Sequence, residues 1–207
     1  MPKVSVIIPM YNCEATLAET VESIINQTYT DWEIVMCDDC STDNTYNIAA
    51  SYAERYDNIV LIKNETNMRA GHTRNKCAEI AKGEYLALVD ADDISLPQRF
   101  EKQVAYLDAH PEMSLVASAL IVFDENGDKL VRGLGEEYPL KRLVRRSVPF
   151  AQPTVMIRKS AFDKLGGYVV SKETMRAEDA DLWFRFRLAK MDGYVIQEPL
   201  VRYHETT

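Results

Sequence analysis

Short apolar runs alternate with longer amphipathic segments through the first half of the chain. Four runs rich in apolar residues predict strands, at 4–8, 33–37, 59–62 and 85–89. The segments that follow them predict helices, at 15–27, 41–56, 71–81 and 97–110. Pro9 is expected to end the first strand. This alternation is typical of an α/β fold with a Rossmann-like, mostly parallel sheet flanked by helices.

The second half has a less regular pattern. It predicts a strand at 115–123, a turn at 125–128, a short amphipathic helix at 139–147, a strand at 152–157, a turn at 166–168, a helix at 177–190 and two short apolar runs around Val195 and Val201. No repeat or low-complexity stretch interrupts the chain, so we expect one domain over 1–207. The sequence stops directly after Tyr203-His204-Glu205 without a terminal helix, as a piece of a longer protein would.

Composition narrows the function classes. Hydrophobic residues make up 46% of the 207 residues, enough for a sizeable core, and the formal net charge of −8 disfavours nucleic acid as a partner. No apolar run approaches the ~18 residues that span a bilayer, and no secretory signal is evident. The four cysteines form no disulfide framework, which favours a reducing, cytoplasmic setting. Cys37-x-x-Cys40 lacks the second half of a zinc site, so we expect ordinary thiols.

Polar clusters follow all four predicted parallel strands. They are Pro9-Met10-Tyr11-Asn12, Asp38-Asp39-Cys40-Ser41, Asn64-Glu65-Thr66-Asn67 and Asp90-Ala91-Asp92-Asp93. Ligands of open α/β sheets bind outside the carboxyl ends of the strands, where these clusters would meet. The sequence therefore predicts a ligand site at this edge.

The cluster at 90–93 predicts a binding site for a metal-bound phosphate ester. Three carboxylates at the end of a buried strand repel one another, and a divalent cation would relieve that repulsion. Oxygen ligands suit Mg²⁺ or Mn²⁺, and Mg²⁺ is usually held by one or two carboxylates together with substrate phosphates. The alternative is an acidic loop that caps the helix beginning near Pro97.

Six motifs in a fixed order resemble the inverting glycosyltransferases of family 2, which have the GT-A fold. They are Val6-Ile7-Ile8-Pro9-Met10-Tyr11-Asn12, Ser23-Ile24-Ile25-Asn26-Gln27-Thr28, Asp38-Asp39-Cys40-Ser41-Thr42-Asp43, Arg74-Asn75, Asp90-Ala91-Asp92-Asp93 and Glu178-Asp179-Ala180-Asp181-Leu182-Trp183. The resemblance implies a nucleotide-sugar-binding half at 1–110 and an acceptor-binding half at 111–207. One departure is Cys40, where the family usually has glycine; a backbone with positive φ would strain a cysteine there.

The resemblance implies an activity and a set of residues. The enzyme would move a sugar, with inversion, from a UDP donor to a hydroxyl of a glycan or lipid-linked acceptor in bacterial polysaccharide or cell-surface glycan synthesis. The implied substrate-binding residues are Pro9, Tyr11, Asn12, Asp38 at the base, Asp39, Arg74 and Asp90. The implied Mn²⁺ or Mg²⁺ ligands are Asp90, Asp92 and His204, with Asp93 as a helix cap or supporting residue.

The catalytic base implied by the resemblance is Asp179, with Glu178 as the near alternative and Asp181 in a structural role. Simple matching of the helix dipole by Glu178 and Asp179 is the competing interpretation. A sugar nucleotidyltransferase is a weaker hypothesis, because no glycine-rich loop follows the first strand. A non-catalytic nucleotide-sugar-binding module would keep Asp38 and the cluster at 90–93 but would not need Asp179.

Four basic residues predict a further contact. Lys141, Arg142, Arg145 and Arg146 lie within the helix expected at 139–147, beside apolar residues. One interpretation is an ordinary solvated helix face. The other is peripheral contact with anionic lipid, which would place the enzyme at the inner face of the plasma membrane.

Overall fold

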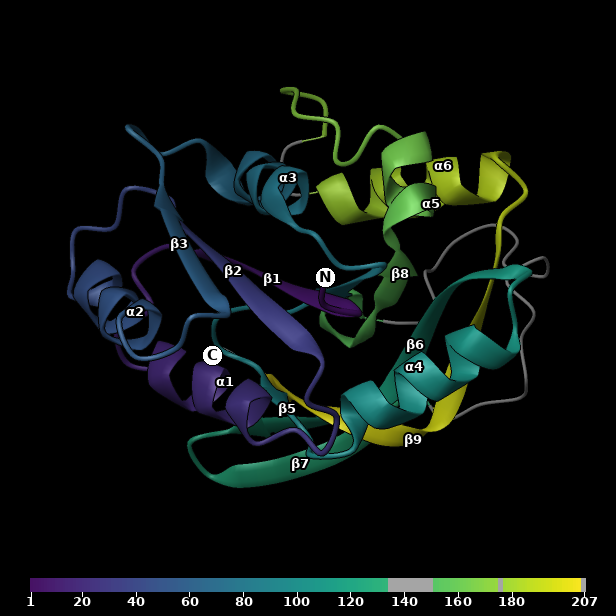
Figure 1. Cartoon of the computed structure of the whole chain (residues 1–207), viewed down its shortest axis with the longest axis horizontal. Coiled ribbons are helices and arrows are strands. Elements are labelled where there is room, and N and C mark those ends of the chain that lie inside the picture. The colour runs from purple at the N-terminus through teal and green to yellow at the C-terminus, as the bar shows by residue number, and fades with distance from the viewer. Residues whose placement is uncertain (134–150, 175–176, 206–207) are drawn as a thin grey trace.

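A computed structural model describes residues 1–133, 151–174 and 177–205 (Figure 1). The basic segment expected to be helical at 139–147 lies outside these residues. Within them, one sheet runs in the order β3-β2-β1-β4-β8-β6-β9-β5, with β7 paired to β6. The predicted α/β fold is confirmed.

The first half follows the predicted alternation closely. Its parallel strands are β1 (Val4–Met10), β2 (Trp32–Asp38), β3 (Ile59–Lys63) and β4 (Tyr85–Leu88). Its helices are α1 (Leu17–Ile25), α2 (Thr45–Ala53), α3 (Arg69–Ile80) and α4 (Arg99–Ala109). All four strands therefore end at one edge of the sheet, which brings the four polar clusters to that edge as predicted.

The prediction that Pro9 ends the first strand is wrong. Pro9 pairs with Cys37 and the strand continues to Met10, paired with Asp38. On the other side of β1, pairing with β4 stops at Ile7 and Leu88. Pro9 lies beyond that point, so its missing N–H costs no ladder hydrogen bond.

The second half extends the sheet with mixed pairing. Its elements are β5 (Ile94–Ser95), β6 (Met113–Asp124), β7 (Gly127–Arg132), the 3₁₀ turn η2 (Gln152–Thr154), β8 (Met156–Arg158), α5 (Lys159–Lys164), α6 (Glu178–Leu188) and β9 (Asp192–His204). Strand β8 is antiparallel to β4 and β6, whereas β9 is parallel to β6. The strand expected at 152–157 is instead a 3₁₀ turn followed by β8.

The two apolar runs around Val195 and Val201 belong to one strand. The register of β9 against β6 shifts where Ser118 pairs with Ile196 and Ala119 pairs with Pro199. The two residues between Ile196 and Pro199 bulge out of the ladder, which is where a strand tolerates proline. This bulged strand carries His204 back to the edge that holds the polar clusters.

Two hydrophobic cores lie on opposite faces of the sheet. Helices α1, α2 and α4 cover one face and α3, α5 and α6 the other (Figure 1). Alternate residues of β1 and β2 divide between them, with Ile34 and Met36 in the first core and Val35 and Cys37 in the second. The site at the carboxyl edge therefore rests on strands packed from both sides.

Candidate active site

A cavity of about 570 Å³ opens at the carboxyl edge of β1 and β4. The first turn of α3 and the end of β9 complete its wall. Its lining residues are Pro9, Met10, Tyr11, Asn12, Cys13, Ala15, Thr16, Asp39, Asn67, Arg69, Ala70, Thr73, Arg74, Asp90, Ala91, Asp92 and His204. We call it the donor cavity. It gathers most of the residues singled out for substrate or metal binding.

The loop after β1 is held to the loop after β2 by side-chain hydrogen bonds. The Asn12 amide oxygen accepts from the backbone N–H of Thr42 at 2.8 Å, and the backbone N–H of Asn12 donates to Ser41 Oγ at 3.0 Å. These bonds support the positive φ of 49° at Asn12. The neighbouring Tyr11 side chain is 51% exposed, so it is not a core residue and can contact a ligand.

The two carboxylates after β2 have different surroundings. Asp38 is fully buried, 3.4 Å from Lys63 Nζ, and does not line the donor cavity. Asp39 lines it and accepts from the backbone N–H groups of Met68 and Arg69, each at 2.8 Å. Of the two, Asp39 is therefore the one that faces the donor cavity.

The turn after Asp39 has the backbone strain expected from the sequence. Cys40 has a φ of 64°, in the left-handed region that favours glycine. Its side chain makes only a long contact, 3.8 Å, from Sγ to the Glu65 carbonyl oxygen. The turn therefore forms with cysteine in place of glycine, but its backbone conformation is less favourable for cysteine than it would be for glycine.

Arg74 is a buried anchor of the cavity wall. It is only 8% exposed, and its Nη2 lies 2.5 Å from Asp90 Oδ1. Its guanidinium stacks near the Tyr168 ring, 5.7 Å from the centroid, and the Gln152 amide oxygen can accept from it at 3.1 Å. Burial acts to lower the pKa of Arg74, but Asp90 and Tyr168 raise it above its usual value. Asp90 is thus fixed in place by a permanent cation.

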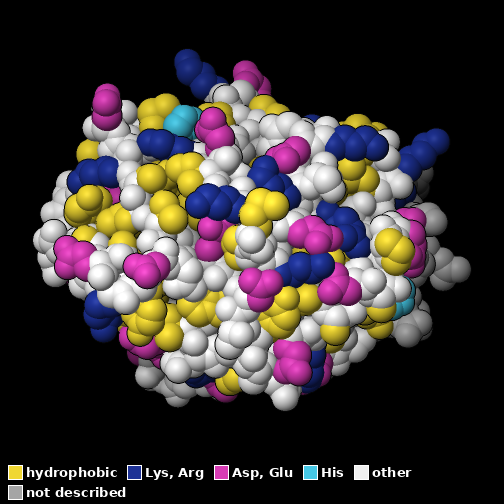
Figure 2. Space-filling view, viewed as in Figure 1, with side chains coloured by type: hydrophobic (Ala, Val, Ile, Leu, Met, Phe, Trp, Pro, Cys, Tyr) yellow, Lys and Arg dark blue, Asp and Glu magenta, His cyan; other side chains and the backbone are white. Residues whose placement is uncertain are grey.

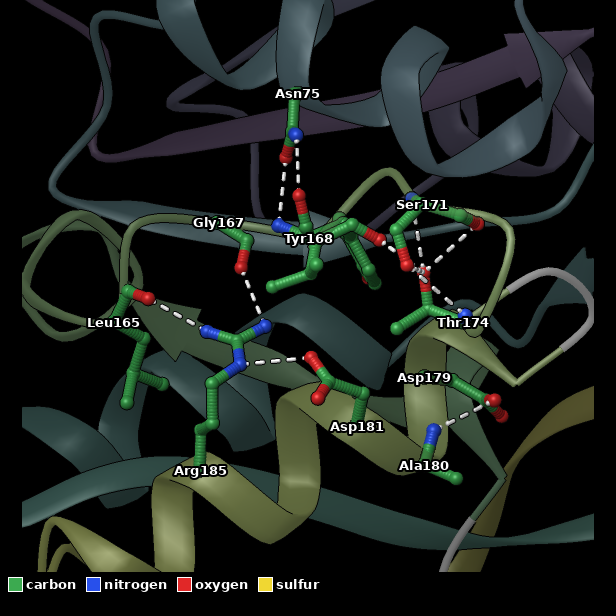
Figure 3. A network of polar contacts seen from close by, with 11 residues as sticks. Asn75, Leu165, Gly167, Tyr168, Ser171, Thr174, Asp179, Ala180, Asp181 and Arg185 are labelled. Carbon is green, nitrogen blue, oxygen red and sulfur yellow. Dashed lines mark hydrogen bonds and ion pairs between the residues drawn. The ribbon is translucent and has the colours of Figure 1, made fainter.

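The Tyr168 phenol is affected by two groups of acidic residues. The Tyr168 backbone N–H and carbonyl are both bonded by the Asn75 side chain at 2.8 Å (Figure 3). Burial raises the pKa of the Tyr168 phenol; Arg74 opposes this, while the charges of Asp90, Asp179 and Glu178 add to it. The charges of Asp90, just after β4, and of Glu178 and Asp179, at the start of α6, therefore act on the same phenol.

His204 and Asp92 provide further metal donors. His204 Nδ1 lies 3.9 Å from Asp92 Oδ2 and has no hydrogen-bond partner within the described residues, although it is buried. Burial, and then Asp90, raise the pKa of Asp92. Nearby, Asp93 accepts from the His204 backbone N–H at 2.8 Å. Asp92 is repelled by the charge of Asp90, and the imidazole nitrogen beside it has no partner among the described residues. Together these two groups offer ligands that suit a divalent cation.

This donor set is incomplete by itself. Among residues 1–133, 151–174 and 177–205, no three His, Cys, Asp or Glu side chains group closely enough to enclose a metal ion. Mg²⁺ and Mn²⁺ commonly take their remaining ligands from phosphate oxygens. The arrangement therefore suits a cation that arrives with a diphosphate.

The carboxylates of α6 begin the helix beside α3. A Cβ built on Gly71 would lie 3.6 Å from the Glu178 side chain, so the two helices pack closely there. Asp179 Oδ1 accepts from the backbone N–H of Ala180 at 2.7 Å (Figure 3). Asp181 instead pairs with Arg185 at 2.7 Å, and Arg185 also donates to loop carbonyls, as a structural residue does.

A second cavity of about 540 Å³ adjoins the donor cavity. Its lining residues are Asn67, Met68, Arg69, Ala70, Gly71, His72, Val169, Val170, Ser171, Lys172, Thr174 and Glu178. Asn67, Arg69 and Ala70 line both cavities. We call it the side cavity. Glu178 reaches the side cavity, whereas neither it nor Asp179 lines the donor cavity.

Sequence reasoning missed Arg69, Gln152 and Tyr168. Arg69 was missed because an arginine in a sequence gives no indication that its backbone has a φ of 69°. Tyr168 and Gln152 are far from Arg74 in the chain and meet it only in the fold. The turn signal of Gly166 and Gly167 was the only pointer to that region, and both glycines do have positive φ.

The molecular surface does not concentrate its negative charge on the face shown in Figure 2, where acidic and basic side chains are intermixed. None of the described helices is long and apolar enough to cross a membrane.

Comparison with known proteins gives a consistent result. The family model for glycosyl transferase family 2 matches residues 5–166. EpsE of Bacillus subtilis, a putative glycosyltransferase, is 46% identical over 205 residues, which is 99% of this chain and 73% of EpsE. WfaP of Escherichia coli, a UDP-Glc:alpha-D-GlcNAc-diphosphoundecaprenol beta-1,3-glucosyltransferase, is 40% identical over 108 residues, 52% of this chain and 42% of WfaP.

Among solved structures, S. aureus TarS 1–349 in complex with UDP matches with a TM-score of 0.82 and 25% identity. The match covers 99% of this chain and 61% of that one, so this chain spans less than two thirds of the solved protein.

Proposed function

This chain belongs to glycosyl transferase family 2, and on that basis we propose that it transfers a sugar from a UDP-sugar to a hydroxyl of a lipid-linked glycan, with inversion at the anomeric carbon. The observation that carries this proposal is the donor cavity, where Tyr11, Asp39, Asp90 and Asp92 share one wall at the carboxyl edge. The similar fold of TarS, solved with UDP, supports the choice of nucleotide.

The roles follow from the positions of the side chains. Tyr11 and Asn12 would lie against the base and ribose, and Asp39, which lines the donor cavity, is the candidate for a polar contact with them. Arg74 holds Asp90, so Asp90 and Asp92 would meet the diphosphate in a fixed orientation. Mn²⁺ or Mg²⁺ held by Asp90, Asp92 and His204 would offset the charge of the leaving diphosphate when bound.

The base is assigned to the start of α6. As the acceptor oxygen attacks the anomeric carbon, the bond from that carbon to the diphosphate breaks and the acceptor proton passes to a carboxylate. Asp179 is our first candidate for that carboxylate and Glu178, which lines the side cavity, is the second. A single displacement of this kind needs one base and inverts the anomeric centre.

The acceptor and location rest on the relatives. WfaP is named for a diphosphoundecaprenol acceptor, which supports a lipid-linked acceptor here. Such an acceptor would bring the enzyme to the inner face of the plasma membrane.

The first experiment measures UDP affinity by isothermal titration, in Mn²⁺ and in excess chelator. We expect UDP to bind at least tenfold more tightly in Mn²⁺, and Asp92→Asn to lose that gain while Asp57→Asn, an exposed surface control, keeps it. Equal affinities in chelator and Mn²⁺ would remove the metal role. Nucleotide-sugar turnover, followed in parallel across a panel of donors, separates a transferase from a module that only binds.

A further inference from the structure

The side cavity has no role in donor binding as described, yet it shares a wall with the donor cavity. Arg69 and Ala70, in the first turn of α3, line both. On its other side lie residues 169–174, and Glu178 of the proposed base pair lines its end. A molecule in the side cavity would therefore lie beside both a bound donor and a candidate base.

The charges that line the side cavity are opposite to those of the chain as a whole. The chain has a net charge of −8, but the side cavity is lined by Arg69 and Lys172, and Glu178 is the one acidic residue among the described residues that line it. Both basic side chains are exposed, and neither forms an ion pair with another residue in the part of the chain that the structure describes. Two unpaired cations in a concave site attract an anion.

Arg69 has a backbone that an arginine would not adopt without compensation. Its φ is 69°, and its N–H is held by Asp39 at 2.8 Å. A non-glycine residue in this left-handed region has a conformational cost that glycine does not have. Packing does not explain that cost, because the Arg69 side chain is exposed. Strain kept at a cavity wall indicates that the side chain itself is used there.

Apolar groups occupy the remainder of the side-cavity wall. Met68, Val169 and Val170 all line it, and they are 40%, 41% and 55% exposed. Large apolar side chains left in solvent beside two cations suit a ligand with a carbon skeleton next to an anionic group.

We propose that the side cavity is the acceptor subsite and that Arg69 and Lys172 bind a phosphate group of the acceptor. This inference rests on the proposed function and adds the acceptor's chemistry to it. A phosphate monoester or diphosphate carries more than one negative charge and several acceptor oxygens, so it matches two cations better than a single carboxylate does. Met68, Val169 and Val170 then contact the carbon skeleton beside the phosphate.

Three probes with the same alkyl chain test the inference: octyl phosphate, octyl glucuronide and octyl glucoside, each kept below its micelle concentration. Binding is measured by isothermal titration with the donor cavity filled by saturating UDP and Mn²⁺. We expect octyl phosphate to bind at least tenfold more tightly than either other probe, and to weaken with added salt.

Variants separate this subsite from a general surface effect. Lys172→Gln is expected to weaken octyl phosphate about tenfold, while Lys164→Gln, an exposed lysine of α5 outside both cavities, leaves the affinity unchanged. Arg69→Gly is expected to raise the thermal midpoint, because it relieves the strained φ, and yet to weaken octyl phosphate. If Arg69 had only a structural role, Arg69→Gly would not raise the thermal midpoint and also weaken octyl phosphate binding.

The inference is overturned if octyl glucoside or octyl glucuronide binds as tightly as octyl phosphate, if Lys172→Gln behaves like Lys164→Gln, or if UDP displaces octyl phosphate. Failure of the proposed function gives a different result. In that case UDP itself does not bind in Mn²⁺, and this is measured before any octyl probe is added.

Discussion

Replacing Asp93 with asparagine should stabilise the protein, increasingly so as the pH rises. Asp93 is 1% exposed; its Oδ1 accepts from the His204 N–H, and its Oδ2 has no hydrogen-bond partner within the described residues. Burial raises the pKa of Asp93 to about 8, helped by the charges of Asp90 and Asp92 and opposed by Arg99. Asparagine keeps the shape and one acceptor oxygen but cannot ionise.

The magnitude follows from the two pKa values. The ordinary pKa is 3.8 and the folded one about 8, so the folded state holds a proton that the unfolded chain releases. A raised pKa contributes stability that is complete below the unfolded value and is lost as the pH rises towards the folded value. The loss is about 1.4 kcal/mol per pH unit. Asp93→Asn does not undergo this loss. The free energy of unfolding of Asp93→Asn relative to wild type should therefore rise by roughly 2–3 kcal/mol between pH 5 and pH 7.

Urea unfolding followed by circular dichroism at pH 5, 6, 7 and 8 measures this advantage, in excess chelator. Asp57→Asn, on the surface, is the matched control and should show no such trend. Mn²⁺ should reduce the advantage, because a cation at Asp90 and Asp92 favours the ionised form of Asp93. A free-energy difference between wild type and Asp93→Asn that stays constant across this pH range refutes the reasoning.

Three other predictions concern the base and the backbone. Asp179→Asn should fold and bind UDP yet lose ~10²–10⁴-fold in transfer rate; a normal rate in single-turnover assays, with Glu178→Gln inactive, would reassign the base. Gly83→Ala should cost about 2 kcal/mol or more in urea unfolding, because its Cβ would lie 2.5 Å from a β1 backbone nitrogen. Gly71→Ala, with its nearest contacts at 3.6 Å, should be tolerated, and equal losses for the two alanines would contradict this. Cys40→Gly should raise the thermal midpoint by a few degrees, and a lower midpoint would show that the turn is unstrained.

The sequence predicted the first half of the fold well because each strand there is a buried apolar run followed by a helix. Boundaries failed where a tertiary partner decides them. Helix α2 begins at Thr45 rather than Ser41, because Ser41 and Thr42 bond instead to Asn12 in the loop after β1. Asp43 accepts from the backbone N–H groups of Glu14 and Thr45. The single strand β9 was split in two, because a bulge before Pro199 breaks its pattern but not its pairing.

The residues of the candidate site were predictable as far as motifs mark them. Asp39, Arg74, Asp90, Asp92 and His204 do meet at one cavity. Access to the donor cavity was not predictable, and it distinguishes the two carboxylates after β2: Asp38 and Asp39 are both buried, but only Asp39 lines the cavity. The contribution of Tyr168 and the strained φ of Arg69 depend on packing between distant segments, which no local pattern encodes.

The return of β9 to the carboxyl edge also has a consequence for how the protein is made. The bond from the His204 N–H to Asp93 joins residues 111 positions apart. Parallel pairing of β9 with β6 likewise must wait until β9, the last of the described strands, has been synthesised. During translation the first four strands can therefore assemble while the donor cavity still lacks one wall. A nascent chain would gain this cavity wall only after nearly all of the described residues had left the ribosome, so the ability to bind donor would report that the chain has folded through β9.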